Sequence, residues 1–283
     1  MTNERTESSP PDLAGVQHEY LDAGGLRLHV ALAGPANAPP VMLVHGWPQN
    51  WWEWRHLIPL LAEDHRLIVP DLRGFGWSDA PEWGYEKEQL ATDLLALLDA
   101  LDIERVTWIG HDWGAWIGML AALRAPHRLT RALIMSVPHL WLPPHPRQLA
   151  LLGYQGPISL PFIGPWAAER MVPRILQAGR GGDRLPVADV ELFAANIPPR
   201  VTVAMYRTFL TREVLPIARG RYETAQLQVP TTVMYGDQDL VTRGLRAGPD
   251  PGQPQLRVEA VPGVAHWIPE QRPRVVLDWL SQN

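Results

Sequence analysis

The chain has 283 residues, of which 46% are hydrophobic and 19% are charged, so it is long enough to bury a large core. Its net charge of -5 provides no attraction to nucleic acid or to an acidic membrane surface, and a small neutral ligand is the simpler expectation. It contains no cysteine, which excludes disulfides, thiol catalysis and cysteine metal sites.

We expect no secretory signal in the N-terminal segment. Residues 1–15 are polar and lack the apolar stretch of a signal peptide, so we interpret them as a flexible tail. Elsewhere no run reaches the roughly 18 apolar residues that cross a bilayer. We therefore expect a cytoplasmic protein without a membrane span, and we make no prediction about its oligomeric state.

The predicted elements begin with a hairpin and continue as alternating strands and helices. Candidate strands at residues 17–21 and 26–32 flank a turn at residues 22–25. A helix is predicted at residues 87–101, where leucine and alanine repeat at helical spacing. Short apolar runs that suit buried parallel strands lie at residues 41–44, 67–70, 106–109 and 132–137. This alternation predicts the α/β class, with a mostly parallel, doubly wound sheet.

The alternation breaks after residue 140, where prolines separate short helical segments up to residue 224. The core elements expected after this insertion are strands at residues 231–235 and 256–261 and a helix at residues 269–280. In chain order, the predicted domains are the tail at 1–15, the first part of the core at 16–139, a helical cap at 140–224 and the second part of the core at 225–283.

A carboxylate occupies the position expected of a nucleophile. The run Gly110-His111-Asp112-Trp113-Gly114 follows a predicted strand and is similar to the Gly-x-Ser-x-Gly turn, in which small residues let the backbone present one side chain above the sheet. With an ordinary pKa of about 3.9, Asp112 is ionised at pH 7 and can attack a saturated carbon to form an ester. Aspartate in place of serine excludes a serine esterase.

Candidates for the acid and the base follow in the order that a hydrolase sheet requires. Asp239, in Tyr235-Gly236-Asp237-Gln238-Asp239 at the end of a predicted strand, is the predicted acid, and Asp237 is the alternative. His266 precedes the last helix and is the predicted base. His45 and His111 lie inside motifs, where a structural hydrogen bond is the expected role.

Backbone donors for an oxyanion hole are predicted at Trp47 and Trp113. The segment His45-Gly46-Trp47-Pro48 follows a predicted strand and would bring the N–H of Trp47 near Asp112. Such donors stabilise developing negative charge, typically by about 10² to 10³ in rate. On its own, the segment is more typical of an ordinary turn.

From about residue 17 to its end, the chain resembles the α/β-hydrolase-fold epoxide hydrolases. The motifs that carry the resemblance are His45-Gly46-Trp47-Pro48, Trp52-Glu53-Trp54-Arg55, Asp71-Leu72-Arg73-Gly74-Phe75-Gly76-Trp77-Ser78, the turn at Asp112, Asp239 and His266. The resemblance implies that a small hydrophobic epoxide and water are converted to a vicinal diol, without a metal or an organic cofactor.

Epoxide opening needs a proton donor, because it produces an alkoxide that is roughly as basic as hydroxide. A phenol, with a pKa of about 10, can supply one. Tyr154 and Tyr206 resemble the two cap tyrosines of the family, and the third cap tyrosine, Tyr222, does not. The match is stronger for Tyr206, because Gly156-Pro157 departs from the aromatic-rich sequence usual after the first tyrosine.

Other functions remain open at the level of sequence. A haloalkane dehalogenase shares the nucleophile, and the indoles of Trp113 and Trp47 could bind a halide, although dehalogenases usually carry asparagine in place of Trp47. A fluoroacetate dehalogenase is disfavoured, because that family has arginine where this chain has Trp113. The fold also serves as a non-catalytic ligand receptor, a class that a turnover assay would separate from an enzyme.

Overall fold

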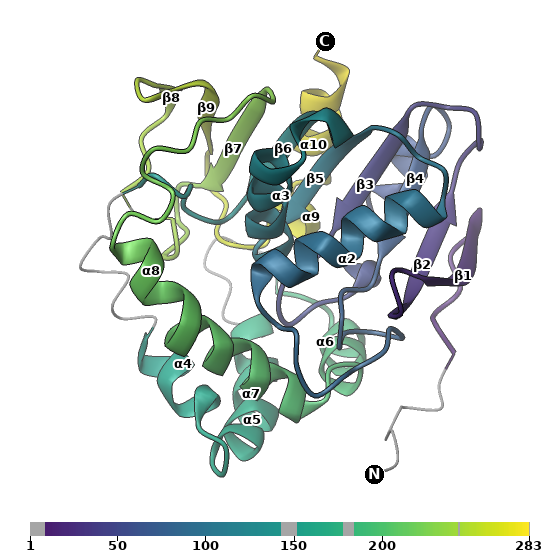
Figure 1. Cartoon of the computed structure of the whole chain (residues 1–283). Coiled ribbons are helices and arrows are strands. Elements are labelled where there is room, and N and C mark those ends of the chain that lie inside the picture. The colour runs from purple at the N-terminus through teal and green to yellow at the C-terminus, as the bar shows by residue number, and fades with distance from the viewer. Residues whose placement is uncertain (1–8, 143–151, 178–183, 243, 283) are drawn as a thin grey trace.

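One mixed sheet runs through the computed structural model, which describes residues 9–142, 152–177, 184–242 and 244–282. Within these ranges its nine strands lie in the order β1-β2-β4-β3-β5-β6-β7-β9-β8 (Figure 1). The six strands from β4 to β9 in this order are parallel, and β1, β2 and β8 pair antiparallel at the two edges. The strands are β1 (Val16–Asp22), β2 (Arg27–Ala33), β3 (Pro40–Val44), β4 (Arg66–Pro70), β5 (Val106–His111), β6 (Leu129–Met135), β7 (Thr231–Gly236), β8 (Gly248–Asp250) and β9 (Gln253–Val261).

Helices cover both faces of the sheet, because the central strands are apolar on both sides. Met42 and Trp108 pack into one hydrophobic cluster, whereas their neighbours Leu43 and Ile109 pack into the other. The helices on the first face are α2 (Lys87–Ala100) and α3 (Trp113–Arg124), followed by the short turn η2 (Pro126–Arg128). The second face carries η1 (Trp51–Trp54), α1 (Ile58–Leu61), α9 (Ile268–Gln271) and α10 (Pro273–Ser281).

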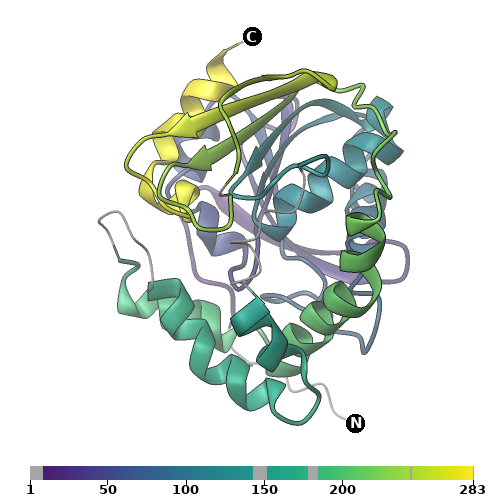
Figure 2. The ribbon, with the colours of Figure 1, turned by 90° about the vertical axis from the view of Figure 1, so that its left-hand side faces the viewer.

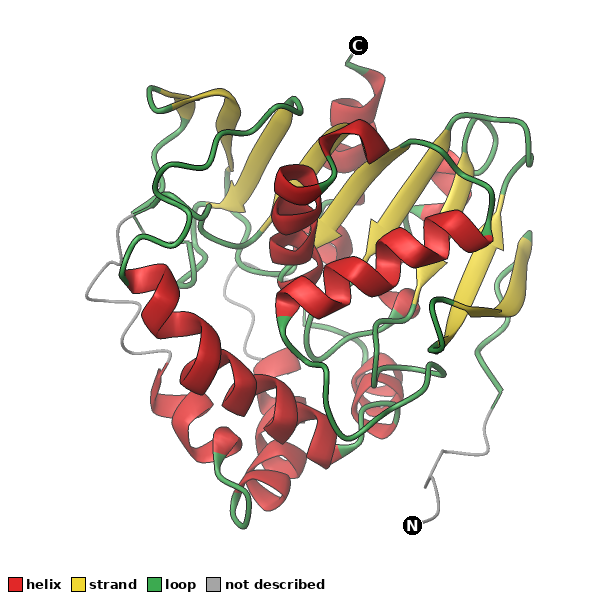
Figure 3. Ribbon diagram, viewed as in Figure 1, coloured by secondary structure: helices red, strands yellow, loops and turns green. Residues whose placement is uncertain are grey.

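A helical layer is inserted between β6 and β7 and lies at one end of the sheet. Figure 3 shows the arrowheads of the central strands pointing toward it, so these helices face the carboxyl ends of the parallel strands. Figure 2 shows the same layer below the sheet from the side. The described helices of this layer are α4 (Leu152–Ser159), α5 (Gly164–Gln177), α6 (Val187–Ala195), α7 (Pro199–Thr208), η4 (Phe209–Glu213) and α8 (Val214–Ala218).

The α/β fold predicted from the sequence is confirmed, and a few of its elements differ. The last helix is wrong as a single element, because α9 ends before Arg272 and α10 begins at Pro273. Proline disfavours a helical backbone in the residue before it, and Arg272 has φ -144° and ψ 57°. Strand β6 ends at Met135 rather than at Val137, because the next residue, Ser136, has φ 62°.

The predicted domain boundaries, including the tail at 1–15 and the cap at 140–224, stay predictions. Residues 1–8 and 143–151 lie outside the described part of the chain. Among the described helices, none combines the length and the apolar character needed to cross a membrane.

Candidate active site

The chain turns sharply at Asp112, between β5 and α3. Asp112 has φ 48° and ψ -119°, a backbone conformation that residues with a side chain rarely adopt. The turn also requires two glycines. A Cβ atom on Gly46 would lie 2.3 Å from the Cβ of Asp112, and one on Gly114 would lie 2.2 Å from the carbonyl oxygen of Val44. The close approach of these backbones leaves the Asp112 side chain at the carboxyl end of β5.

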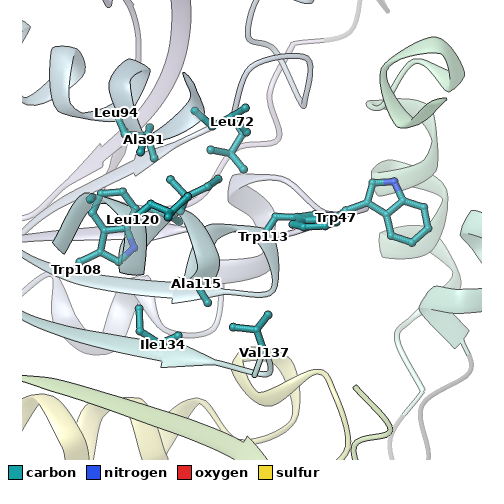
Figure 4. Packing of buried hydrophobic residues seen from close by; sticks show 14 of the residues in the cluster. Trp47, Leu72, Ala91, Leu94, Trp108, Trp113, Ala115, Leu120, Ile134 and Val137 are labelled. Carbon is teal, nitrogen blue, oxygen red and sulfur yellow. The ribbon is translucent and has the colours of Figure 1, made fainter. Parts of the chain in front are cut away.

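The predicted oxyanion-hole donors both reach the carboxylate of Asp112. The backbone N–H of Trp47 donates to Oδ1 at 2.9 Å, and the backbone N–H of Trp113 also donates to this carboxylate. Figure 4 shows Trp47 and Trp113 at the end of the core that faces the helical layer. Burial raises the pKa of Asp112, but its hydrogen bond to His266, the positive charge nearby and the N–H of Trp113 together hold that pKa below its ordinary value.

The structure brings His266 to the other oxygen of Asp112, and Asp239 to the second nitrogen of the His266 imidazole. Nε2 of His266 lies 3.5 Å from Oδ2 of Asp112, and Nδ1 lies 3.1 Å from Oδ2 of Asp239. Asp239 is buried, whereas Asp237 is exposed and accepts a hydrogen bond from the backbone N–H of Gly263. Of the two aspartates, the structure therefore brings only Asp239 into contact with the imidazole.

The charge of His266 depends on these two carboxylates. Burial lowers the pKa of His266, but the negative charge of Asp239 and the hydrogen bonds to Asp112 and Asp239 outweigh it and raise the pKa to about 10. At pH 7 the imidazole is therefore protonated while Asp112 is ionised. The two side chains form an ion pair, with Nδ1–H directed to Asp239 and Nε2–H directed to Asp112.

Two side chains, Ser136 and His111, hold the His266 backbone. Its carbonyl oxygen accepts a hydrogen bond from the hydroxyl of Ser136 at 2.6 Å and lies 2.9 Å from Nε2 of His111. Nδ1 of His111 lies 2.6 Å from Oε1 of the buried Glu53. His111 is thus in a structural position, and so is His45, whose Nε2 accepts the backbone N–H of Leu72 at 3.0 Å. Glu53 stood in a quoted motif, but nothing in the sequence pointed to Ser136.

Tyr154 on α4 and Tyr206 on α7 lie together beside Trp47. Their ring centroids are 5.9 Å apart, and each ring packs against the indole of Trp47. Tyr206 is only 2% exposed. Burial raises the pKa of both phenols, and the negative charge of Asp112 raises both further, so the two hydroxyls keep their protons at neutral pH. Tyr222 is elsewhere, donating to Glu88.

The indole N–H of Trp47 is already used within the protein. It donates to the hydroxyl of Thr202, on α7, at 3.1 Å. This bond ties the residue whose backbone holds Asp112 to the helix that carries Tyr206. Thr202 was missed by the sequence analysis, although it lies one helical turn before Tyr206 and therefore on the same face of α7.

Within the described ranges, no three side chains of histidine, aspartate or glutamate gather in a way that could hold a metal ion. The ionisable groups around Asp112 are instead paired with one another, as the contacts of His266 and Asp239 show. What the arrangement offers chemically is an ionised carboxylate between backbone donors, an imidazole and two protonated phenols.

Comparison with known proteins identifies the class to which this fold and site belong. A family model described as the alpha/beta hydrolase fold matches residues 39–273, and the chain belongs to that family. It is 27% identical to epoxide hydrolase 3 of Xenopus tropicalis over 303 residues, which cover 94% of this chain and 78% of that protein. It is 42% identical to epoxide hydrolase A of Mycobacterium tuberculosis over 123 residues, covering 42% of this chain and 38% of that protein.

The solved structures agree with these sequence matches. The epoxide hydrolase VrEH1 from Vigna radiata is 25% identical and superimposes with a TM-score of 0.76, covering 95% of this chain and 98% of that chain. The sequence motifs indicated a resemblance to the α/β-hydrolase-fold epoxide hydrolases. The family match and the relatives named as epoxide hydrolases confirm that resemblance.

Proposed function

We propose that this protein hydrolyses an epoxide to a vicinal diol through an ester on Asp112. One observation carries the proposal: the two oxygens of this carboxylate have different partners. Oδ1 accepts the backbone N–H of Trp47, whereas Oδ2 lies 3.5 Å from Nε2 of His266. An ester needs this division, because one oxygen must stay in an oxyanion hole while the other bonds to the substrate.

In the first step, Oδ2 of Asp112 attacks a ring carbon of the epoxide. A carbon–oxygen bond of the ring breaks as the ester bond forms, and the ring oxygen takes a proton from a phenol. Tyr206 or Tyr154 is the donor, and either suits the role, because burial keeps both phenols protonated. The resulting phenolate is neutralised by the proton of the imidazolium, which leaves His266 neutral.

Formation of the ester is also what converts His266 into a base. Its raised pKa depends on both carboxylates, and the ester removes the negative charge of Asp112. Asp239 still accepts the proton on Nδ1, so the lone pair of Nε2 is directed toward the ester. The imidazole is thus protonated before the first step and basic after it.

In the second step, water attacks the carbonyl carbon of the ester and gives a proton to Nε2 of His266. Negative charge develops on Oδ1, where the backbone N–H of Trp47 stabilises it, and the backbone N–H of Trp113 donates to the same carboxyl group. The intermediate then collapses: the diol oxygen leaves with the proton from His266, and the new carboxylic acid of Asp112 returns a proton to the imidazole. Atoms and charges balance, and the original ion pair is restored.

A haloalkane dehalogenase would use the same nucleophile, but two contacts favour the epoxide. The indole N–H of Trp47 donates to Thr202, so of the two indoles that could bind a halide only that of Trp113 is left. Loss of a halide needs no proton, whereas here the negative charge of Asp112 raises the pKa of two phenols, Tyr154 and Tyr206, and keeps them protonated. The names of the relatives point in the same direction.

Parallel assays test the proposal. A panel of aryl and cycloalkyl epoxides and of haloalkanes of matched size is incubated with the protein, and diol formation and halide release are measured. We expect diol formation from at least one epoxide. Halide release should be slower than this diol formation by about 10²-fold or more, because a proton donor usually contributes a factor of that size to the reaction that needs it. Halide release without diol would support the dehalogenase, and no turnover of either kind would support a ligand receptor.

A further inference from the structure

The N-terminus of α2 carries a buried ion pair that the reaction described above does not use. Lys87 is 2% exposed, and its ammonium lies 2.5 Å from Oε2 of Glu213. The second oxygen of Glu213 accepts the backbone N–H of Lys87 at 2.9 Å. Lys87 is the single lysine among 25 basic residues, so the chain's one ammonium side chain is placed in its interior.

This pair touches Trp113 directly. The ammonium of Lys87 lies 4.0 Å from the centroid of the Trp113 indole and 4.4 Å from that of the Phe209 ring. A cation over an indole face is attracted by the electron density of the ring, and the attraction grows when water is excluded. Lys87 therefore holds the side chain of the residue whose backbone N–H donates to Asp112.

The other partner connects to Tyr206. Glu213 ends η4, a π-helical segment that continues α7 without a break, and α7 carries Tyr206. Short π-helical segments often occur at functional sites. The ring of Tyr206 also meets the indole of Trp113 edge to face, with centroids 5.8 Å apart. One ion pair thus joins the helix of a predicted proton donor to the residue that follows the predicted nucleophile.

A buried ion pair gives little net stability, because removing both charges from water costs about as much as their attraction returns. Apolar side chains of similar volume would stabilise the contact between α2 and η4 equally well. Unlike apolar side chains, the pair requires one arrangement, in which the ammonium meets a carboxylate oxygen and an indole face together. A residue that positions a reacting group must hold one defined arrangement, and this ion pair does so.

We propose that Lys87 and Glu213 are positioning residues, which hold Tyr206 and the backbone N–H of Trp113 in register over Asp112. The proposal rests on the proposed function, since it concerns groups that act in epoxide hydrolysis. The ammonium is held where Glu213, Glu86 and Asp112 all stabilise its charge. Burial nevertheless lowers the pKa of Lys87 to about 8.

The test replaces the pair by apolar side chains and measures kcat and KM for an epoxide that the wild-type protein hydrolyses. In Lys87→Met/Glu213→Leu no buried charge is left without a partner, so the variant is expected to fold. We expect kcat per active site to fall about 10-fold to 100-fold, as misplacement of reacting groups by about 1 Å does, while KM changes less than threefold. A purely structural role would lower the melting temperature and leave kcat of the folded protein unchanged.

A second variant covers the case in which the first does not fold. Glu213→Gln keeps an oxygen that can accept the N–H of Lys87 and removes only the charge, and the same loss of kcat is expected. The matched control is Arg73→Met/Asp93→Leu, which removes another ion pair of α2, with N–O distances of 2.7 Å, and should leave kcat within threefold.

The outcomes separate the two proposals. Wild-type kcat in a folded Lys87→Met/Glu213→Leu protein, or in Glu213→Gln if the former is unfolded, would overturn the positioning role and leave the proposed function intact. An equal loss in the Arg73→Met/Asp93→Leu control would overturn it as well. A wild-type protein that turns over no epoxide would overturn the proposed function, and the positioning role with it.

Discussion

The backbone N–H of Trp47 donates to Oδ1 of Asp112 at 2.9 Å, and under the proposed mechanism this hydrogen bond decides which oxygen of the carboxylate stays with the enzyme. An oxygen held in an oxyanion hole becomes the carbonyl oxygen of the ester. In the same mechanism the other oxygen, Oδ2, would leave with the diol. The protein, rather than the solvent, would then supply the new oxygen of the first product molecule.

Isotope labelling tests this consequence. In a single turnover in H₂¹⁸O, with enzyme in excess over epoxide, we expect the diol to contain no ¹⁸O and Asp112 to gain one ¹⁸O atom. Mass spectrometry of the diol and of the peptide that contains Asp112 measures both. Label in the diol after the first turnover would mean that water attacks the epoxide directly.

The close approach of Gly46 to Asp112 predicts that a larger residue at position 46 disturbs the active site. A methyl group on Gly46 would lie 2.3 Å from the Cβ of Asp112, so one of the two backbones must move. We expect Gly46→Ala to lower kcat about 100-fold, because the N–H of Trp47 follows directly in the chain. Gly153→Ala is the matched control, since a Cβ there has open space, and its activity should be unchanged. Activity of Gly46→Ala near that of wild type would show that the turn tolerates the shift.

The sequence predicted more of the core than of the contacts between core and cap. The Asp112 turn could be predicted because glycines close to it in the chain mark a sharp bend. The short apolar runs identified the central strands. The contacts of Thr202 and Glu213 could not be predicted from the sequence. Their partners Trp47 and Lys87 are 155 and 126 residues away in the chain, and no local pattern reports such a pairing. The break at Pro273 could have been predicted from the effect of proline on the preceding residue.

The ion pair between His266 and Asp112 predicts a dependence of stability on pH. The pKa of His266 is raised from 6.5 to about 10, so the pair contributes its full stability below pH 6.5 and loses it as the pH rises through 10. We expect the free energy of unfolding to fall between pH 7 and pH 10 in the wild-type protein and to fall less in His266→Gln. Urea unfolding at several pH values measures this difference. Parallel curves for the two proteins would contradict the raised pKa.

Asp112, together with Asp239, raises the pKa of His266. Asp112→Asn keeps the shape of the side chain and removes its charge, as ester formation does. We expect the pKa of His266 to fall substantially in this variant, which NMR titration of ¹³C-labelled histidine can follow. An unchanged pKa would mean that Asp239 alone sets it, and that ester formation does not make His266 more basic.

If the phenols act as proton donors, the effect of removing them should depend on the leaving group of the substrate. Tyr206→Phe should slow epoxide opening by about 10² to 10⁴, the range of general acid catalysis, and Tyr154→Phe should slow it less if Tyr206 is the principal donor. Any turnover of a haloalkane should be nearly unaffected, because a halide leaves without a proton. Single-turnover rates on both substrates measure the effect, and equal losses on both would indicate that the tyrosines act only by packing.

The most direct measurement concerns the ester itself. His266→Gln removes the base for the second step and leaves Asp112 and both phenols in place, so the ester should form and persist. After incubation with an aryl epoxide such as styrene oxide, intact-mass spectrometry should show an increase equal to one substrate molecule, and peptide mapping should locate it on Asp112. No adduct with any epoxide that the wild-type protein hydrolyses, together with an active Asp112→Ala variant, would contradict the covalent mechanism.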